Sequence, residues 1–176
     1  MHFFASSTLL FTLVVTVLVK PAVQPNAIGL FNINDFQGYG LNLISNVNPA
    51  EGTAVVVAPG TSASALNQEW SLISKGGSIV WIASGLNSSL FLSYPSASRG
   101  GFSYGSELIA SSQFPANFSL QAVTGTTFKI IEWNSRLALT SWKAVPGSPA
   151  APAIFVELND NLAAQQTWSI VAAPLV

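Results

Sequence analysis

The sequence predicts an all-β protein assembled from three copies of one four-stranded unit. The segment Gln68-Glu69-Trp70-Ser71-Leu72-Ile73 returns as Gln166-Thr167-Trp168-Ser169-Ile170-Val171, so its two tryptophans are 98 residues apart. Asn117-Phe118-Ser119-Leu120 stands midway as a weaker copy, with Phe in place of Trp and no Gln. One aromatic-Ser-aliphatic element therefore occurs three times at steps of 48 and 50 residues, a spacing typical of repeat architectures.

Each copy also contains three earlier apolar segments in the same order, separated by Gly, Pro, Ser and Asn. Short apolar runs bounded by these turn residues are typical of strands of four to six residues. Four strands in each of three units give twelve, and the stretch nearest to a helical period is 158–166. The first segments are 29–33, 79–82 and 128–131, the second are 41–43, 90–92 and 137–139, and the third are 54–57, 107–109 and 153–156.

The repeat also predicts how the units pack. A unit of about 48 residues cannot bury its own apolar face, so three units should close around a shared axis and remove their exposed edges. This threefold closure favours a β-trefoil over a sandwich. We expect one domain over 26–176, with repeats at about 26–73, 74–121 and 122–172. The chain of 176 residues contains no cysteine, so its core must stabilise the fold without disulfides.

Composition excludes some classes of partner. The chain is 49% hydrophobic and only 7% charged, with a formal net charge of −1. Its basic residues form no run, whereas a nucleic-acid partner requires a concentrated positive face that displaces counterions. We therefore expect no nucleic-acid partner.

Residues 1–22 are predicted to be a signal peptide. Leu9 to Val19 is an uninterrupted apolar run of the length of a signal-peptide core, and it is short for a membrane span. Cleavage after Ala22 or Ala27 would start the mature chain between residues 23 and 28, and a retained membrane anchor is the alternative. The sequons at Asn87 and Asn117 agree with a secreted, extracellular glycoprotein that has no membrane contact after cleavage.

Several catalytic arrangements are excluded by missing residue types. Residues 101–105 match the G-x-S-x-G nucleophile elbow, but a serine nucleophile needs a histidine, and the only one is His2, inside the predicted signal peptide. Without cysteine or a second histidine, no Cys-His pair and no zinc site with nitrogen or sulfur ligands can form. We expect no enzymatic activity, metal or cofactor. The carboxylates have no matching positions among the units and are expected to be solvated: Asp35, Glu51, Glu69, Glu107, Glu132, Glu157 and Asp160.

Three units of about 48 residues that end in Gln-x-Trp resemble the ricin-type (ricin B-like) lectin domain, a β-trefoil. The resemblance covers about residues 26–172. It implies that the aromatic residue of each copy packs in a shared core, while the glutamine bonds nearby backbone. Strand alternation would then turn Glu69 and Thr167 outward. The implied core positions are Gln68, Trp70, Phe118, Gln166 and Trp168.

The resemblance also implies where a galactose-like sugar would bind. The family uses an Asp in the second strand, an aromatic residue at the end of the third, and an Asn before the Gln of Gln-x-Trp. Unit one offers Asn42, Asn67 and Gln68 at the polar positions, but Val57 at the aromatic one. No unit is complete, so we expect weak glycan binding centred on unit one. Unit two has Phe91 for the Asp and Ala116 for the Gln, and unit three has Ala138 for the Asp, Gln165 for the Asn and Phe155 near the aromatic position.

Two other functions stay open. A secreted trefoil could bind a protein, as a protease inhibitor does, through the proline-rich loop Val145–Pro152, which its prolines would preorganise. It could also be a structural wall or matrix protein without a defined ligand. Trp133 and Trp142 flank a loop of unit three and are expected either to pack in the core or to form a stacking platform.

Overall fold

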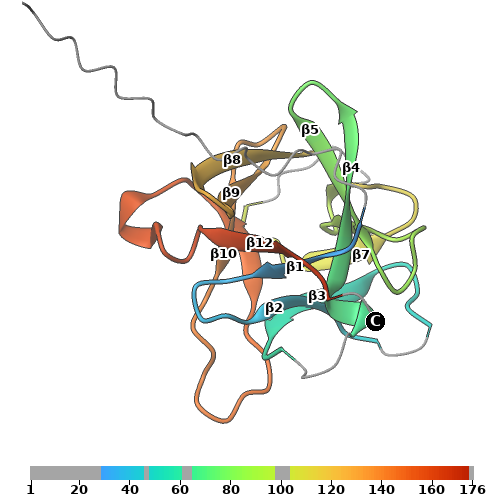
Figure 1. Ribbon diagram of the computed structural model, residues 1–176, viewed down its shortest axis with the longest axis horizontal. Coiled ribbons are helices and arrows are strands. Elements are labelled where there is room, and N and C mark those ends of the chain that lie inside the picture. Colours follow the sequence, from blue (N-terminus) through green and yellow to red (C-terminus); the bar gives the residue numbers. More distant parts are fainter. Residues whose placement is uncertain (1–28, 46–47, 61–64, 98–103, 175–176) are drawn as a thin grey trace, which may run out of the picture.

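The computed structural model describes residues 29–45, 48–60, 65–97 and 104–174. The predicted signal peptide, both candidate cleavage positions and Ser103 of the G-x-S-x-G match lie outside these ranges. The described part is all-β, with twelve strands in one sheet and short 3-10 helices (Figure 1). The predicted fold class is confirmed at this level. One of these helices, η3 (Asp160–Leu162), lies within the stretch that most resembled a helix in the sequence.

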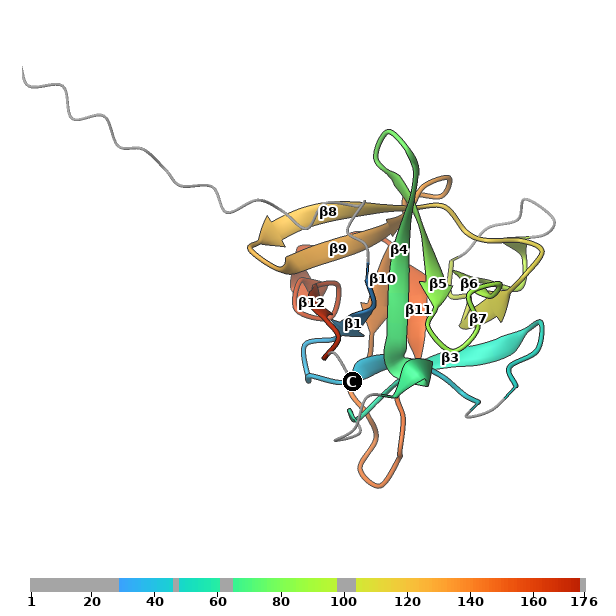
Figure 2. The same ribbon diagram turned by 45° about the vertical axis from the view of Figure 1, so that its right-hand side comes forward.

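Six strands form a closed barrel. Each pairs antiparallel with its neighbours in the ring order β1, β4, β5, β8, β9, β12, and β12 pairs with β1 again (Figure 2). Among the described residues, closure leaves no barrel strand with a free edge along its full length, as the threefold repeat required. The strands are β1 (Phe31–Asn34), β4 (Glu69–Gly76), β5 (Ile79–Ser84), β8 (Phe118–Thr124), β9 (Thr127–Glu132) and β12 (Trp168–Ala172).

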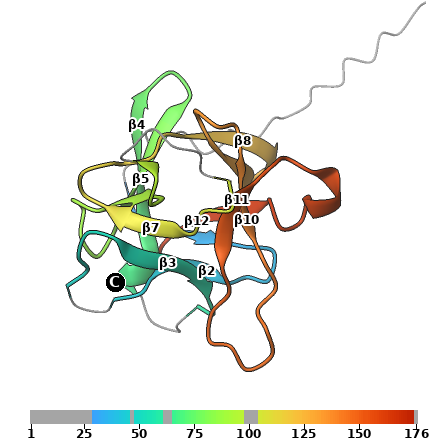
Figure 3. The same cartoon turned by 180° about the vertical axis from the view of Figure 1, so that it is seen from behind.

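Three short hairpins cap one end of the barrel and meet around the same axis (Figure 3). Strand β3 pairs with β7, and two isolated backbone bridges link the third hairpin to them: Glu107, just before β7, pairs with Ile154, and Val57 pairs with Ala151, just before β11. The cap is therefore closed as well. The hairpins are β2 (Gly40–Leu43) with β3 (Thr53–Ala58), β6 (Phe91–Ser93) with β7 (Leu108–Ser111), and β10 (Ala138–Ser141) with β11 (Ala153–Val156).

The aromatic residues of the repeated element lie between barrel and cap. Trp70, Phe118 and Trp168 are fully buried. The Trp70 Nε1–H donates to the Leu41 carbonyl at 2.9 Å, and the Trp168 Nε1–H donates to the Leu139 carbonyl at the same distance. Both bonds span 29 residues, so they occupy equivalent places in units one and three.

Unit two replaces this indole bond with a backbone one. The Phe118 ring has no donor and stacks on Phe155 at a centroid separation of 6.1 Å. The Leu92 carbonyl, which corresponds to those of Leu41 and Leu139, accepts the Ala116 N–H at 3.2 Å instead. A buried carbonyl without a donor would be costly, so this exchange permits the loss of both Trp and Gln in the second copy.

Three carboxylates that we expected to be solvated are buried, so that expectation is wrong for Asp35, Glu69 and Glu132. Asp35 directly follows β1 and Glu132 is the last residue of β9, at equivalent positions in their units, and both accept backbone N–H groups of the next turn. Asp35 Oδ1 accepts from Gln37 and Tyr39 at 2.8 and 2.9 Å, and Glu132 Oε2 accepts from Ser135 at 2.6 Å. These turns, rather than solvent, satisfy the charge.

Glu69 was also expected to face outward, and it does not. The Gly85 turn of unit two lies against its backbone, and the Gly85 N–H donates to the Glu69 carbonyl at 2.7 Å. A Cβ at Gly85 would stand 2.9 Å from that oxygen, so only glycine permits this close approach. Thr167, its counterpart in unit three, is half-buried, because no turn covers it in the same way.

Replacing Trp70 or Trp168 with Phe should separate the indole bond from the packing. Phe fits the site, as Phe118 shows, so the loss should be about 1–3 kcal/mol, as for a buried polar group that loses its partner. Replacement by Ala should cost about 3–5 kcal/mol because it also opens a cavity. Urea unfolding of the variants would measure both. The half-exposed Trp142 is the control, and an equal loss in Trp142→Phe would contradict this account.

Candidate functional site

The structure brings together the three polar residues predicted in unit one. Asn67 in η1 (Leu66–Gln68) donates from Nδ2 to Oδ1 of Asn42 in β2 at 2.7 Å. Gln68 donates from Nε2 to the Pro59 carbonyl at 3.1 Å, which ties η1 to the end of β3. Gly40 opens β2 beside the Gln68 carboxamide, since a Cβ there would lie 3.7 Å from it. The result is a compact amide cluster on one hairpin.

The cluster has an exposed and a buried part. Asn42 and Asn67 are half-buried, whereas Gln68 is only 8% exposed. Asn42 accepts the bond from Asn67 with its side-chain oxygen, so its amino group, which carries two donors, takes no part in that bond. Asn42 and Asn67 can thus present hydrogen-bonding groups to a ligand. Gln68 is the buried part of the cluster and holds η1 in place.

The aromatic position that the resemblance implied lies in the core. Val57 and Phe155 are both fully buried, opposite Leu41 and Leu139 in their hairpins. Phe155 packs edge-on against Tyr94 at 5.6 Å as well as on Phe118, so it cannot stack on a sugar. The unit-three expectation for Phe155 is therefore wrong.

In unit one, the apolar surface beside the amide cluster comes from outward-facing residues of β3 rather than from Val57. Val56 lies opposite Asn42, and Ala58 lies opposite Gly40. Both are half-buried and face the amide cluster. The apolar part of this candidate site is therefore aliphatic and small.

The second strands of the three units align differently from the sequence expectation. The pairs Asn34 with Gly40, Ala83 with Phe91 and Ile131 with Ala138 occupy equivalent places. Phe91 and Ala138 thus correspond to Gly40, not to Asn42, and the predicted alignment was two residues off. A shift of two preserves the alternation of buried and exposed positions, so the apolar pattern could not reveal it.

The corrected counterparts of Asn42 are Ser93 and Thr140, which are also polar. Both are fully buried and already bonded within their own unit. Ser93 Oγ donates to the Phe114 carbonyl at 2.5 Å, and Thr140 Oγ1 accepts from Gln166 Nε2 at 3.2 Å. Only the unit-one member of this set is exposed enough to meet a ligand.

The two glutamines of the repeated element share one equivalent hydrogen bond, but Gln166 makes more bonds than Gln68. Gln166 donates to the Glu157 carbonyl at 2.7 Å, which matches the bond from Gln68 to Pro59. Gln166 also accepts the Asn159 N–H at 3.0 Å and is fully buried. Its side chain therefore belongs to the framework.

Neither tryptophan of the unit-three loop belongs to the buried core. The Arg136 guanidinium lies over the Trp133 ring at 4.5 Å, and Trp142 is 37% exposed. The Trp142 carbonyl accepts from Gln37 Nε2 at 3.3 Å, which attaches this loop to the β1–β2 turn. A shared stacking platform stays a prediction, and core packing of both rings is wrong.

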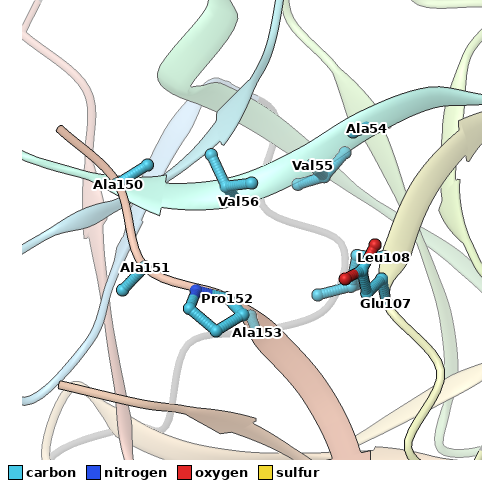
Figure 4. A pocket seen from close by; sticks show the side chains of 9 residues that line it. All are labelled: Ala54, Val55, Val56, Glu107, Leu108, Ala150, Ala151, Pro152 and Ala153. Carbon is cyan, nitrogen blue, oxygen red and sulfur yellow. The ribbon is translucent and has the colours of Figure 1, made fainter. Parts of the chain in front are cut away.

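A pocket of about 160 Å³ lies in the cap, beside the predicted protein-binding loop (Figure 4). Its walls are aliphatic, and Glu107 is the one charged residue that lines it. The Glu107 side chain is exposed. The residues that line the pocket are Ala54, Val55, Val56, Glu107, Leu108 and 150–153.

Another carboxylate of the cap, Glu51, is fully engaged by a neighbouring unit. Its oxygens accept from the Ser111 hydroxyl at 2.6 Å and from the Ser112 N–H and hydroxyl at 2.6 and 2.8 Å. The bond from Ser111 is the main cause that lowers the pKa of Glu51 below its usual value, against an opposing effect of burial. Glu51 therefore joins β3 to β7 and is not a candidate ligand group.

Comparison with solved structures identifies the fold. The designed threefold-symmetric protein ThreeFoil superposes with a TM-score of 0.68 at 19% identity, over 81% of this chain and 98% of that one. The ricin B-like lectin of Macrolepiota procera, solved with lactose, gives 0.66 at 19% identity, over 86% and 100%. The C-terminal domain of an earthworm lectin, a mutant solved with 6'-sialyllactose, gives 0.59 at 20% identity, over 82% and 98%.

These matches show that the chain has the β-trefoil fold of ricin B-like lectins. At such identities the likeness concerns the fold alone. No family model matches the sequence, and no curated protein matches it either. Within the described ranges, no helix is long and apolar enough to cross a membrane, and no group of three His, Cys, Asp or Glu residues could hold a metal ion.

The unequal roles of the two glutamines predict unequal effects on stability. Gln166→Ala removes three bonds of a fully buried side chain and should cost about 2–4 kcal/mol, since each buried group left unpaired costs about 1–3 kcal/mol. Gln68→Ala removes one bond at a partly open site and should cost about 1 kcal/mol. Urea unfolding at neutral pH would measure both, and a larger loss for Gln68→Ala would refute the framework role of Gln166.

Proposed function

We propose that this protein is a secreted carbohydrate-binding protein with one weak site in unit one and degenerate sites in units two and three. The observation that carries the proposal is the amide cluster of Asn42, Asn67 and Gln68 on an exposed hairpin. Directed carboxamide donors and acceptors suit sugar hydroxyls, which also donate and accept. The structural similarity to two lectins that were solved with lactose and with 6'-sialyllactose supports glycans as the ligand class.

The composition of the site sets its expected strength. Val56 and Ala58 offer a small aliphatic surface, so a sugar gains no stacking partner there. An aromatic face would contribute about 0.5–1.5 kcal/mol beyond burial, which is up to about tenfold in affinity. Asn42 also lacks the charge that strengthens bonds to hydroxyls. We expect dissociation constants for monosaccharides in the millimolar range.

Catalysis forms no part of the proposal. Among the described carboxylates, Asp35 and Glu132 are held by turn N–H groups, and Glu51 is held by serines. A glycosidase needs two carboxylates that face each other across the scissile bond. We therefore propose a binding protein without enzymatic activity or cofactor.

Protein binding is the second candidate, and one observation favours it. The predicted loop Val145–Pro152 projects from the cap in Figure 1, and Val145 is 71% exposed. Backbone bonds between Ala151 and Val57 anchor its end to β3. An exposed apolar residue on an anchored loop suits insertion into a partner's cleft.

Sugar binding can be tested by titrating galactose, lactose and N-acetylhexosamines while following backbone amide shifts by NMR. Shifts should centre on the Asn42 hairpin, and Asn42→Ala should weaken binding about three- to tenfold, as the loss of one or two hydrogen bonds does. Asn48→Ala replaces an exposed asparagine of the same hairpin connection and is the matched control. Unchanged binding in Asn42→Ala would exclude this site. Absence of any shift would favour the protein-binding or structural alternatives.

Export and glycosylation can be tested together by mass spectrometry of the secreted chain. We expect a new amino terminus between residues 23 and 28. We also expect a glycan on Asn87, whose neighbours Ser88 and Ser89 are exposed. Asn117 should carry less, because its side-chain oxygen accepts the Trp81 indole N–H at 2.8 Å and both its neighbours are at least half-buried. Intact Met1 on an intracellular protein would refute export.

A further inference from the structure

A second depression lies outside the three family positions, where unit one meets unit three. Its volume is about 370 Å³, and it lies between the β1–β2 turn and the connection that leads into β12. Figures 1 and 3 both show these two segments side by side at one edge of the barrel. The residues that line it are Asp35, Phe36, Thr127, Ala163, Ala164, Thr167 and Ser169.

Phe36 gives this depression an exposed aromatic wall. Its side chain is 41% exposed, although it follows directly after the buried Asp35. The Asp35 carboxylate accepts from the backbone of Gln37 and Tyr39, from Gln37 Nε2 at 3.0 Å and from the Ser141 hydroxyl at 2.5 Å. The turn that carries the ring is therefore fixed from both sides. A preorganised ring costs a ligand little ordering.

Hydroxyl groups line the side opposite the turn. Thr167, just before β12, and Ser169 within it alternate with the buried Trp168 and Ile170, so both face out of the barrel. Thr127 pairs with Ser169 across β9 and β12, but its hydroxyl is held by Thr124: it donates to the Thr124 carbonyl at 2.8 Å and accepts the Thr124 N–H at 3.1 Å. The Thr167 hydroxyl donates to the Ala163 carbonyl at 2.7 Å, which leaves its lone pairs as acceptors.

The equivalent junction between units two and one is filled. There Gly85 takes the place of Phe36, Leu30 that of Thr127, and Glu69 that of Thr167. A Cβ on Gly85 would lie 3.1 Å from the Glu69 Cβ and 3.2 Å from Leu30 Cδ2. At the junction of units one and three, small residues and an aromatic ring stand where the other junction has this packed contact. The opening therefore results from the residues at this junction and not from the fold itself.

We propose that this depression is a second carbohydrate site, which takes the N-acetylhexosamine unit of a glycan. The Phe36 ring would face the apolar side of the pyranose, and Thr167 and Ser169 would bond its hydroxyls. Ala163 and Ala164 form an apolar patch that suits the acetamido methyl group. The inference takes its ligand class from the proposed function, but it depends on none of the residues of the unit-one site.

The test is an NMR titration of the folded secreted chain with N-acetylglucosamine, N-acetylgalactosamine, glucose and galactose. The amides of Thr127, Ala164, Thr167 and Ser169 should shift, and the N-acetyl sugars should bind about threefold or more tightly than the parent hexoses, because one buried methyl contributes about that much. Shifts at these amides that do not distinguish the sugars would overturn the N-acetyl assignment.

Two variants separate this site from the unit-one site. Phe36→Ala should weaken binding here about two- to tenfold and leave the shifts of the Asn42 hairpin unchanged. Asn42→Ala should do the opposite, so either site can fail alone. Phe114→Ala is the matched control, since Phe114 is 42% exposed but lies in unit two.

A filled junction provides a further check that does not remove the ring. Ala164→Leu should occupy the depression and abolish the shifts, while the dispersed spectrum reports that the chain remains folded. Phe36→Trp should retain or strengthen binding. Undiminished binding in Phe36→Ala or in Ala164→Leu would overturn the proposal, as would the absence of shifts at this junction with every sugar.

Discussion

The contact between each repeat's last strand and its own cap hairpin is the interaction on which the rest of the structure depends. In units one and three a buried indole donates to a carbonyl of the second strand, 29 residues earlier in the chain. The glutamine two residues before it then binds the end of the third strand. One short segment thus joins barrel, cap and connecting loop. Because both acceptors are backbone carbonyls, the arrangement places no demand on the side chains of the strands it binds.

That independence explains how the units differ without changing the fold. Unit two lacks both the indole and the glutamine, yet the Leu92 carbonyl still receives a donor, from the Ala116 backbone. Its ring packs on Phe155 of unit three, which lies at the centre of the core. At this position each unit requires an aromatic ring that fills the core and a donor for the carbonyl of the second strand. Two different sets of residues meet this requirement. Outward-facing positions are then free to vary from one unit to the next.

The sequence was sufficient for the closed all-β architecture, because the Gln-x-Trp element identifies one point of each unit. It was insufficient for the register of the second strands, since the turns that precede them differ in length and a slip of two residues leaves the apolar alternation intact. Ser93 and Thr140 were missed for that reason. The burial of Asp35, Glu69 and Glu132 was missed because a charged residue at the end of a strand is predicted to be exposed. Only the position of the neighbouring turn shows that it is buried. Phe36 and Ser169, which line one depression, are far apart in sequence, and no local pattern connects them.

The functional capacity of each unit follows from where its polar groups find partners. Asn42, Ser93 and Thr140 occupy one equivalent position, but the two hydroxyls are fully buried and bonded inside the fold. Asn42 is instead bonded to Asn67, which is also half-buried at the surface. Of the three equivalent positions, only that of Asn42 can therefore exchange a protein contact for a contact with a ligand. The same reasoning applies to the unit junctions, where Leu30 and Glu69 close one against Gly85 while Thr127 and Thr167 leave another open beneath Phe36. A threefold frame therefore supplies three equivalent places of each kind, and the size and bonding of a few side chains decide which of them can accept a ligand.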